Sequence, residues 1–130
     1  MSDLSATLSH GPMLLDGGLG QELLHRGMPD AEPSLWSANA LLEAPALVQT
    51  VHEDYLRAGA DILTTNTYAT PPERLAEAGL GDQVEALNST AGRLAEQARD
   101  AVGRDALIAG SLPPIRGSYR PDRVGERDVI

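Results

Sequence analysis

The sequence predicts an α/β fold in which parallel strands alternate with helices. Three short apolar runs, at 12–16, 61–65 and 106–110, are bounded by glycine or polar residues and have the length of buried strands. The stretches between them carry apolar residues three and four positions apart, which is the spacing of an amphipathic helix. Such helices are long enough to join parallel strands by right-handed crossovers. The expected order is therefore β-α-β-α-β.

The first strand is expected at 12–16, where the apolar run meets the glycine pair Gly17-Gly18. A short helix should follow over 19–26, because its apolar residues recur at helical spacing and a glycine stops it. A second helical piece is expected over 36–42. The first crossover therefore contains more than one helix.

The longest helix of this crossover is expected to begin at Pro45 and to end at Gly59. Proline suits the first turn of a helix, where a missing N–H costs no hydrogen bond, and glycine suits the residue after the last turn. The expected apolar face of this helix consists of Leu47, Val48, Val51, Tyr55 and Leu56. The second strand then follows at 61–65.

The second crossover starts near Pro72, pauses at 79–81 and resumes as a long helix that Gly103 closes. The apolar residues of that helix fall on one face: Val84, Leu87, Ala91, Leu94, Ala98 and Val102. The third strand is expected at 106–110. None of the strands alternates cleanly between polar and apolar residues, so both faces of the sheet are expected to be covered. A closed barrel and an open doubly wound sheet both fit this order.

The composition excludes several classes of function. The 130-residue chain contains no cysteine and no lysine, so it cannot form a disulfide, a thiolate zinc site or a lysine Schiff base. Its 10 cations are arginines set against 19 acidic residues, and the net charge of -9 makes nucleic acids and anionic membranes poor partners. Neither a membrane span of roughly 18 apolar residues nor a signal peptide is recognisable. We expect a soluble, cytoplasmic protein.

Polar residues gather at the carboxyl ends of the expected strands. The turn 16–18 follows the first strand, the segment 65–68 follows the second, and 111–114 follows the third. In a parallel α/β protein such turns lie side by side at the edge where ligands bind. Each turn alone is equally consistent with a local role, such as Asp16 capping the next helix. Together they predict a binding pocket.

Two other kinds of site are poorly supported. The glycine cluster at 18–23 has Leu23 in place of the third glycine of a dinucleotide-binding fingerprint, and no acidic residue closes a strand about 20 residues later. The histidines are His10, His25 and His52, and no two of them are four residues apart, so a three-histidine zinc site is not expected. His52 is expected to be structural, and His25 to face solvent.

Five blocks of sequence succeed one another along the chain: LDGGLGQEL at 15–23, LWS at 35–37, AGADILTTNTY at 58–68, AGSLPP at 109–114 and GSYRPD at 117–122. In this order they resemble the opening of the homocysteine S-methyltransferase family. The block at 58–68 is the most specific of the five, whereas the Asp-Gly-Gly turn alone is common.

The resemblance implies a TIM (β/α)8 barrel, of which this chain supplies about the first three β/α units. A complete barrel needs about 250 residues. Residues 1–11 would then be a flexible leader, and 12–130 the N-terminal part of a truncated homocysteine-binding domain. Such a fragment would be inactive in isolation.

The implied reaction transfers a methyl group from a donor such as S-methylmethionine or betaine to the zinc-activated thiol of homocysteine, giving methionine. Zinc converts a thiol to a thiolate near neutral pH. The zinc ligands of the family are cysteines, so the resemblance places them outside this cysteine-free chain.

The amino-acid-binding side of the site is what the resemblance carries over to this chain. Asp16 matches the family's aspartate, and a carboxylate suits the ammonium group of an amino acid. Gly17 and Gly18 would allow backbone N–H groups to approach the substrate closely. Asn66 and Thr67 would supply hydrogen-bonding groups at the neighbouring strand end.

Two aromatic residues complete the expected substrate-binding set. Tyr68 is at a loop position where its ring could wall the pocket. Trp36 could cover the site or contact a cationic methyl donor, and packing beneath the loop is an equally good explanation for it.

Two rival interpretations stay open. One is a non-catalytic α/β module that binds a small molecule and folds as a compact monomer. The other is a segment of an aldolase-like or phosphate-binding barrel, which the absence of lysine and of a glycine-rich phosphate loop disfavours. A cysteine followed by a Cys-Cys pair further along the coding sequence would decide for the methyltransferase.

Overall fold

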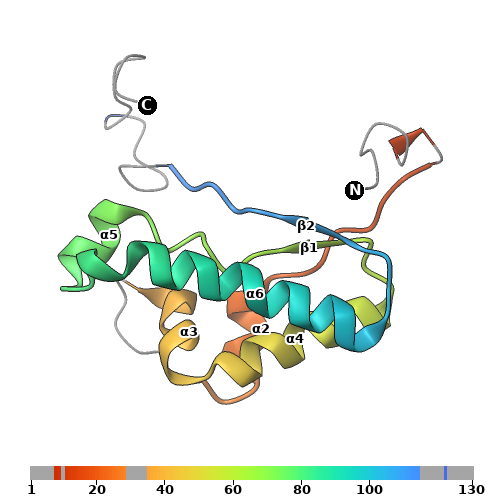
Figure 1. Ribbon diagram of the computed structural model, residues 1–130, viewed down its shortest axis with the longest axis horizontal. Helices are drawn as coiled ribbons and strands as arrows, with labels where there is room; N and C mark the ends of the chain where they lie inside the picture. Colours follow the sequence, from red (N-terminus) through yellow and green to blue (C-terminus); the bar gives the residue numbers. More distant parts are fainter. Residues whose placement is uncertain (1–7, 10, 29–34, 115–121, 123–130) are drawn as a thin grey trace.

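The computed structural model describes residues 8–9, 11–28, 35–114 and 122 of the chain (Figure 1). Its elements are α2 (Leu19–His25), η1 (Trp36–Asn39), α3 (Ala40–Glu43), α4 (Pro45–Ala58), β1 (Ile62–Thr64), α5 (Pro72–Glu77), η2 (Gly81–Gln83), α6 (Val84–Val102) and β2 (Leu107–Ala109). The predicted alternation of helices and strands is confirmed. Most of the expected leader, 1–7 and residue 10, lies outside the described residues.

A short parallel sheet organises these elements. β1 pairs in parallel with β2, so that Ile62 stands opposite Leu107. The strand expected at 12–16 is reduced to one parallel bridge, between Leu15 and Ile62. The N–H of Asp16 donates to the carbonyl of Ile62 over 3.0 Å. β1 is therefore the central strand, with the segment around Leu15 on one side and β2 on the other.

The helices lie on one face of this sheet, where α4 and α6 run side by side (Figure 1). Leu63 in the middle of β1 is fully buried, whereas Leu14 and Leu15 keep 56% and 61% of their surface exposed. The expectation that both faces are covered is thus wrong for the part of the chain that the structure describes. The apolar composition of the strands suits a sheet that is buried on both faces, whereas the described helices pack on one face only.

The core of the described residues consists of two clusters, and α4 and α6 contribute to both. The first is centred on the packing of α4 with α2, α3 and α6 and includes Leu23, Leu41, Val48, Val51 and Leu94. The second lies between α4, α6 and the sheet and includes Leu56, Leu63, Ala95, Ala98 and Ala106. Ala95 and Ala98 of α6 are fully buried, and their small side chains let this helix approach the strands closely.

The predicted ends of the two long helices are confirmed. α4 begins at Pro45, and α6 ends at Val102 with Gly103 as its C-cap. Gly59 and Gly103 have φ angles of 111° and 69°, the left-handed region that glycine enters without steric cost. These glycines let the chain leave each helix and turn directly into the following strand.

Arg104 ties together the edge of the sheet that lies opposite to the carboxyl ends of the strands. Its guanidinium donates to the carbonyls of Gly59 and Ala60 and pairs with the Asp61 carboxylate at 2.8 Å. The other oxygen of Asp61 accepts the N–H of Leu14 at 2.9 Å. The N–H of Leu14 and then the guanidinium of Arg104 hold the pKa of Asp61 below its ordinary value. One arginine thereby links three successive segments of the sheet.

Replacing Arg104 with alanine is expected to lower the melting temperature by about 3 to 8 °C, because two backbone carbonyls and one carboxylate lose their donor. Arg99→Ala is the matched control. In the described part of the chain, the guanidinium of Arg99 pairs with the neighbouring Asp100 at 3.4 Å on the helix surface, and such pairs contribute little. Thermal unfolding followed by circular dichroism measures both variants. Equal melting temperatures for the two would contradict the role assigned to Arg104.

Candidate functional site

A hollow of about 260 Å³ lies at the carboxyl edge of the parallel strands. Its walls come from the segment 15–20, from Ser37, from 64–66 together with Tyr68, and from Ser111. The three turns that follow the expected strands therefore do meet at one edge of the sheet, as the sequence predicts.

The structure brings most of the predicted site residues together. Asp16, Gly17, Gly18, Asn66 and Tyr68 all line the hollow. Thr67 is not among the lining residues, because its hydroxyl is bonded to the β2 loop, as described below. Trp36 belongs to η1, and its side chain lies outside the described part of the structure.

Thr64 holds the carboxylate of Asp16 in a fixed orientation. The backbone N–H of Thr64 donates to Asp16 Oδ2 and its hydroxyl donates to Oδ1, each over 2.8 Å. Asp16 does not cap the following helix, because α2 begins after Gly18 and has no side-chain cap. The carboxylate is thus part of the wall of the hollow and is oriented from the neighbouring strand.

Thr64 and Ser37 also line the hollow and were not predicted as site residues from the sequence. The bridge between Leu15 and Ile62 sets the register that places residue 64 beside the side chain of Asp16. That register was not part of the prediction. A correct alignment of the first two strands is the signal that could have revealed Thr64.

Thr64→Val is expected to lower the free energy of unfolding by about 1 to 2 kcal/mol, because Asp16 loses its hydroxyl donor while the backbone bond remains. Valine keeps the branched shape that suits a strand. Thr64→Ser retains the hydroxyl and should stay close to the wild type. Urea unfolding compares the three proteins, and a wild-type midpoint for Thr64→Val would show that the hydroxyl bond contributes nothing.

Three hydroxyl and amide groups join the loop after β1 to the loop after β2. The hydroxyl of Thr67 donates to the carbonyl of Ser111 over 2.9 Å, and the N–H of Ser111 donates back to it over 3.1 Å. The hydroxyls of Thr65 and Thr67 lie 3.0 Å apart. Thr67 therefore fixes the relative position of two walls of the hollow.

Asn66 connects the same loop to η1. Its amide Nδ2 donates to the carbonyl of Ser37 over 2.8 Å, and 5% of Asn66 is exposed. This bond places η1, the element that contains Trp36, next to the carboxyl end of β1. Further along the loop, the buried Thr70 donates to Asn88 of α6 over 2.8 Å. The loop is thus held from both sides.

The two described histidines differ in their surroundings. His52 is fully buried on α4, and neither of its ring nitrogens has a hydrogen-bond partner. Burial lowers the pKa of His52, and the negative charge of Asp16 opposes this shift. His25 has a side chain that is 75% exposed. Both positions agree with the sequence-based expectation.

The described residues do not assemble a metal site. No group of three His, Asp or Glu side chains in 8–9, 11–28, 35–114 and 122 comes together as a metal ion would require. Over the same residues, every helix is too short or too polar to cross a membrane.

Comparison with known proteins identifies the family. Residues 13–128 match the family described as homocysteine S-methyltransferase. The chain is 41% identical over 117 residues to homocysteine S-methyltransferase of Escherichia coli, covering 85% of this chain and 37% of that protein. It is 41% identical over 88 residues to selenocysteine methyltransferase of Astragalus bisulcatus, covering 67% and 26%.

A solved structure supports the same assignment. The metallated form of the homocysteine methyltransferase MmuM from Escherichia coli superposes with a TM-score of 0.78 at 40% identity, covering 92% of this chain and 44% of that one. The chain thus spans about two fifths of the length of these full-length relatives from Escherichia coli. Its α/β arrangement with parallel strands matches the corresponding part of MmuM, and the chain belongs to the homocysteine S-methyltransferase family.

Proposed function

We propose that this chain forms the amino-acid-binding part of a site that methylates homocysteine to methionine. The methyl group would come from a sulfonium or quaternary ammonium donor, such as S-methylmethionine or betaine. The observation that carries the proposal is the Asp16 carboxylate, oriented by Thr64 in the wall of the hollow, in a chain of this family.

The role of Asp16 follows from its chemistry. An ionised carboxylate only accepts hydrogen bonds, and the two bonds from Thr64 leave lone pairs on both oxygens for a further donor. The ammonium group of homocysteine is such a donor and gains a charge-assisted bond. A hollow of about 260 Å³ is at the small end of ligand sites and suits an amino acid of this size.

The neighbouring residues take different parts in this proposal. Gly17 and Gly18 line the hollow and give the substrate access to the backbone. Tyr68 supplies an aromatic wall, against which the positive charge of a methyl donor is stabilised. Asn66 and Thr67 position the loops through Ser37 and Ser111, so we assign them a supporting role in substrate binding.

The metal in this proposal is zinc, which lowers the pKa of the substrate thiol. The described residues provide no ligand set for it, and the chain has no cysteine, so the ligands would lie outside this chain. The metallated form of the Escherichia coli relative supports a metal in the complete site. We place the reaction in the cytoplasm, where the homocysteine thiol stays reduced.

A chimera tests the proposal. In it, the segment of this chain that aligns with the Escherichia coli homocysteine S-methyltransferase replaces the matching segment of that enzyme. We expect the chimera to form methionine from homocysteine and S-methylmethionine, measured by mass spectrometry. A folded chimera that contains zinc and forms no methionine would contradict the proposal, and would favour a module that binds a small molecule without catalysis.

A further inference from the structure

The ring of Tyr55 lies directly against Gly17. A Cβ atom added to Gly17 would be 2.8 Å from the Tyr55 hydroxyl oxygen and 2.9 Å from its ring carbon Cε1. Both distances are shorter than real Cβ contacts, so Tyr55 leaves no room for a side chain at this position. The backbone of Gly17 does not itself require glycine, because its φ is not in the left-handed region. The contact with Tyr55 is therefore what demands glycine here.

The adjacent glycine is in a different situation. A Cβ atom on Gly18 would meet nothing nearer than the Cβ of Gln21 at 4.0 Å, and the φ of Gly18 is -70°. An alanine would fit the structure at residue 18, whereas it would collide with a ring at residue 17. The structure therefore requires glycine at residue 17 for steric reasons, and it places no such requirement on residue 18.

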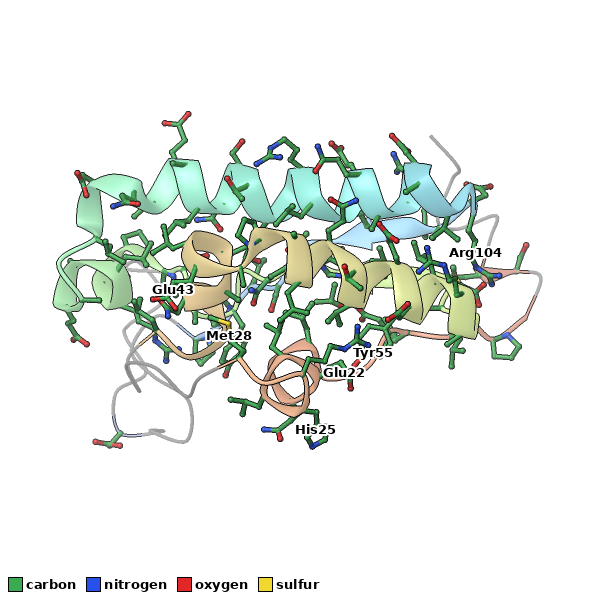
Figure 2. All side chains as sticks on the ribbon, turned by 90° about the horizontal axis from the view of Figure 1, so that it is seen from below. Glu22, His25, Met28, Glu43, Tyr55 and Arg104 are labelled. Atoms are coloured by element: carbon green, nitrogen blue, oxygen red, sulfur yellow. The ribbon has the colours of Figure 1, made fainter. Side chains whose placement is uncertain are left out.

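The position of Tyr55 is set by the core. Its ring packs against both hydrophobic clusters. Figure 2 shows Tyr55 beside Glu22, where α4 faces α2. The preceding residue, Asp54, pairs with Arg26 at 2.8 Å and so ties α4 to the C-terminal end of α2. The segment of α4 at 54–55 therefore holds the turn and the helix that follows it.

Tyr55 stays outside the hollow, although Gly17 lines it. Burial raises the pKa of the Tyr55 hydroxyl, and the negative charges of Glu22 and Asp16 add to this effect. The group that supports the turn is thus a neutral phenol, which contacts Gly17 from outside the hollow.

We propose that Tyr55 is a positioning residue for substrate binding, whose ring sets the place of Gly17 and through it that of the Asp16 carboxylate. The inference rests on the proposed function, because it assumes that the hollow accepts homocysteine. Shape is the property that matters here, so the ring is required and the hydroxyl is not.

A double-mutant cycle in the 130-residue chain tests the contact without reference to function. Gly17→Ala is expected to lower the melting temperature by about 5 to 15 °C, since an overpacked contact must shift backbone or ring. The same substitution should cost much less in a Tyr55→Ala background, because the obstructing ring is gone. Gly18→Ala is the matched control and should leave the melting temperature nearly unchanged.

Two outcomes of the cycle are decisive. If Gly17→Ala alone does not fold, recovery of folding in the Gly17→Ala/Tyr55→Ala variant supports the contact. An equal loss from Gly17→Ala in both backgrounds overturns it.

Titration with L-homocysteine, followed by the amide NMR signals of residues 16–18 in the full chain, tests the effect on the site. Tyr55→Phe keeps the ring and should bind with the wild-type Kd. Tyr55→Leu should bind roughly tenfold more weakly, because displacement of a binding group by a fraction of an ångström is costly. A wild-type Kd for Tyr55→Leu overturns the positioning role. A wild-type chain that does not respond to homocysteine overturns the substrate half of this inference. The cycle still decides whether Tyr55 supports Gly17, and the chimera separately decides the proposed function.

Discussion

Asp16→Asn is expected to raise the KM for homocysteine in the chimera by about one to two orders of magnitude. A charge-assisted hydrogen bond to an ammonium group is worth roughly 1.5–3 kcal/mol, and the substitution removes the charge while keeping the shape. The KM for the methyl donor and the zinc content should change little, because Asp16 is assigned to the amino-acid end of the substrate. Kinetics with homocysteine varied at saturating donor measure the effect.

Asparagine can satisfy the groups that Asp16 satisfies now. Its carbonyl oxygen can accept the backbone N–H of Thr64, and its amide can donate to the Thr64 hydroxyl. The fold should therefore persist, and an unchanged melting temperature is the check on this point. Asp82→Asn removes an exposed carboxylate of η2 and serves as the charge-matched control. Wild-type kinetics for Asp16→Asn would remove Asp16 from the site.

Acidification below about pH 6.5 is expected to destabilise the fold through His52. Burial lowers the folded-state pKa of His52 from its ordinary 6.5, so below pH 6.5 the unfolded chain binds a proton that the folded chain does not. The stability that neutral His52 contributes is therefore fully present above pH 6.5, and it is lost as the pH falls toward the lowered pKa of the folded state. The loss approaches about 1.4 kcal/mol per pH unit for a single proton.

His52→Leu should remove this dependence. Leucine leaves no buried nitrogen without a partner, so the variant should be as stable as the wild type or more stable at pH 8. His25→Gln is the control, because it removes a histidine whose side chain is 75% exposed. Urea unfolding at pH 8, 7, 6 and 5 compares the three proteins. A parallel loss of stability in the wild type and in His52→Leu would show that other groups cause the acid sensitivity.

The sequence predicted helices better than strands, and the reason is physical. The ends of α4 and α6 depend on local sequence. Pro45 suits a first turn, and Gly59 and Gly103 suit positions with positive φ, so these boundaries can be predicted from single residues. A strand depends on its neighbours on both sides. The segment 12–16 has the right composition and still forms only one bridge, because pairing is decided by partners far along the chain.

The same distinction applies to the site. Asp16 could be placed at the ligand-binding edge because that edge follows from the order of strands and helices. The bond from Thr64 to Asp16 depends on strand register, and the contact of Tyr55 with Gly17 depends on how α4 lies on the sheet. Tyr55 was predicted only as part of an apolar face. Thr67 was assigned to the substrate, and its hydroxyl partner in the structure, Ser111, could not be read from local sequence.

The bonds that shape the hollow also bear on the order of folding. Asp16 and Thr64 are 48 residues apart in the chain, and Thr67 and Ser111 are 44 apart. Closing such long loops costs chain entropy before any contact is gained, so non-local pairings of this kind form slowly. Hydrogen exchange should accordingly find this edge among the first parts to open. If homocysteine binds only when this edge is closed, its binding would stabilise the closed edge and delay that opening.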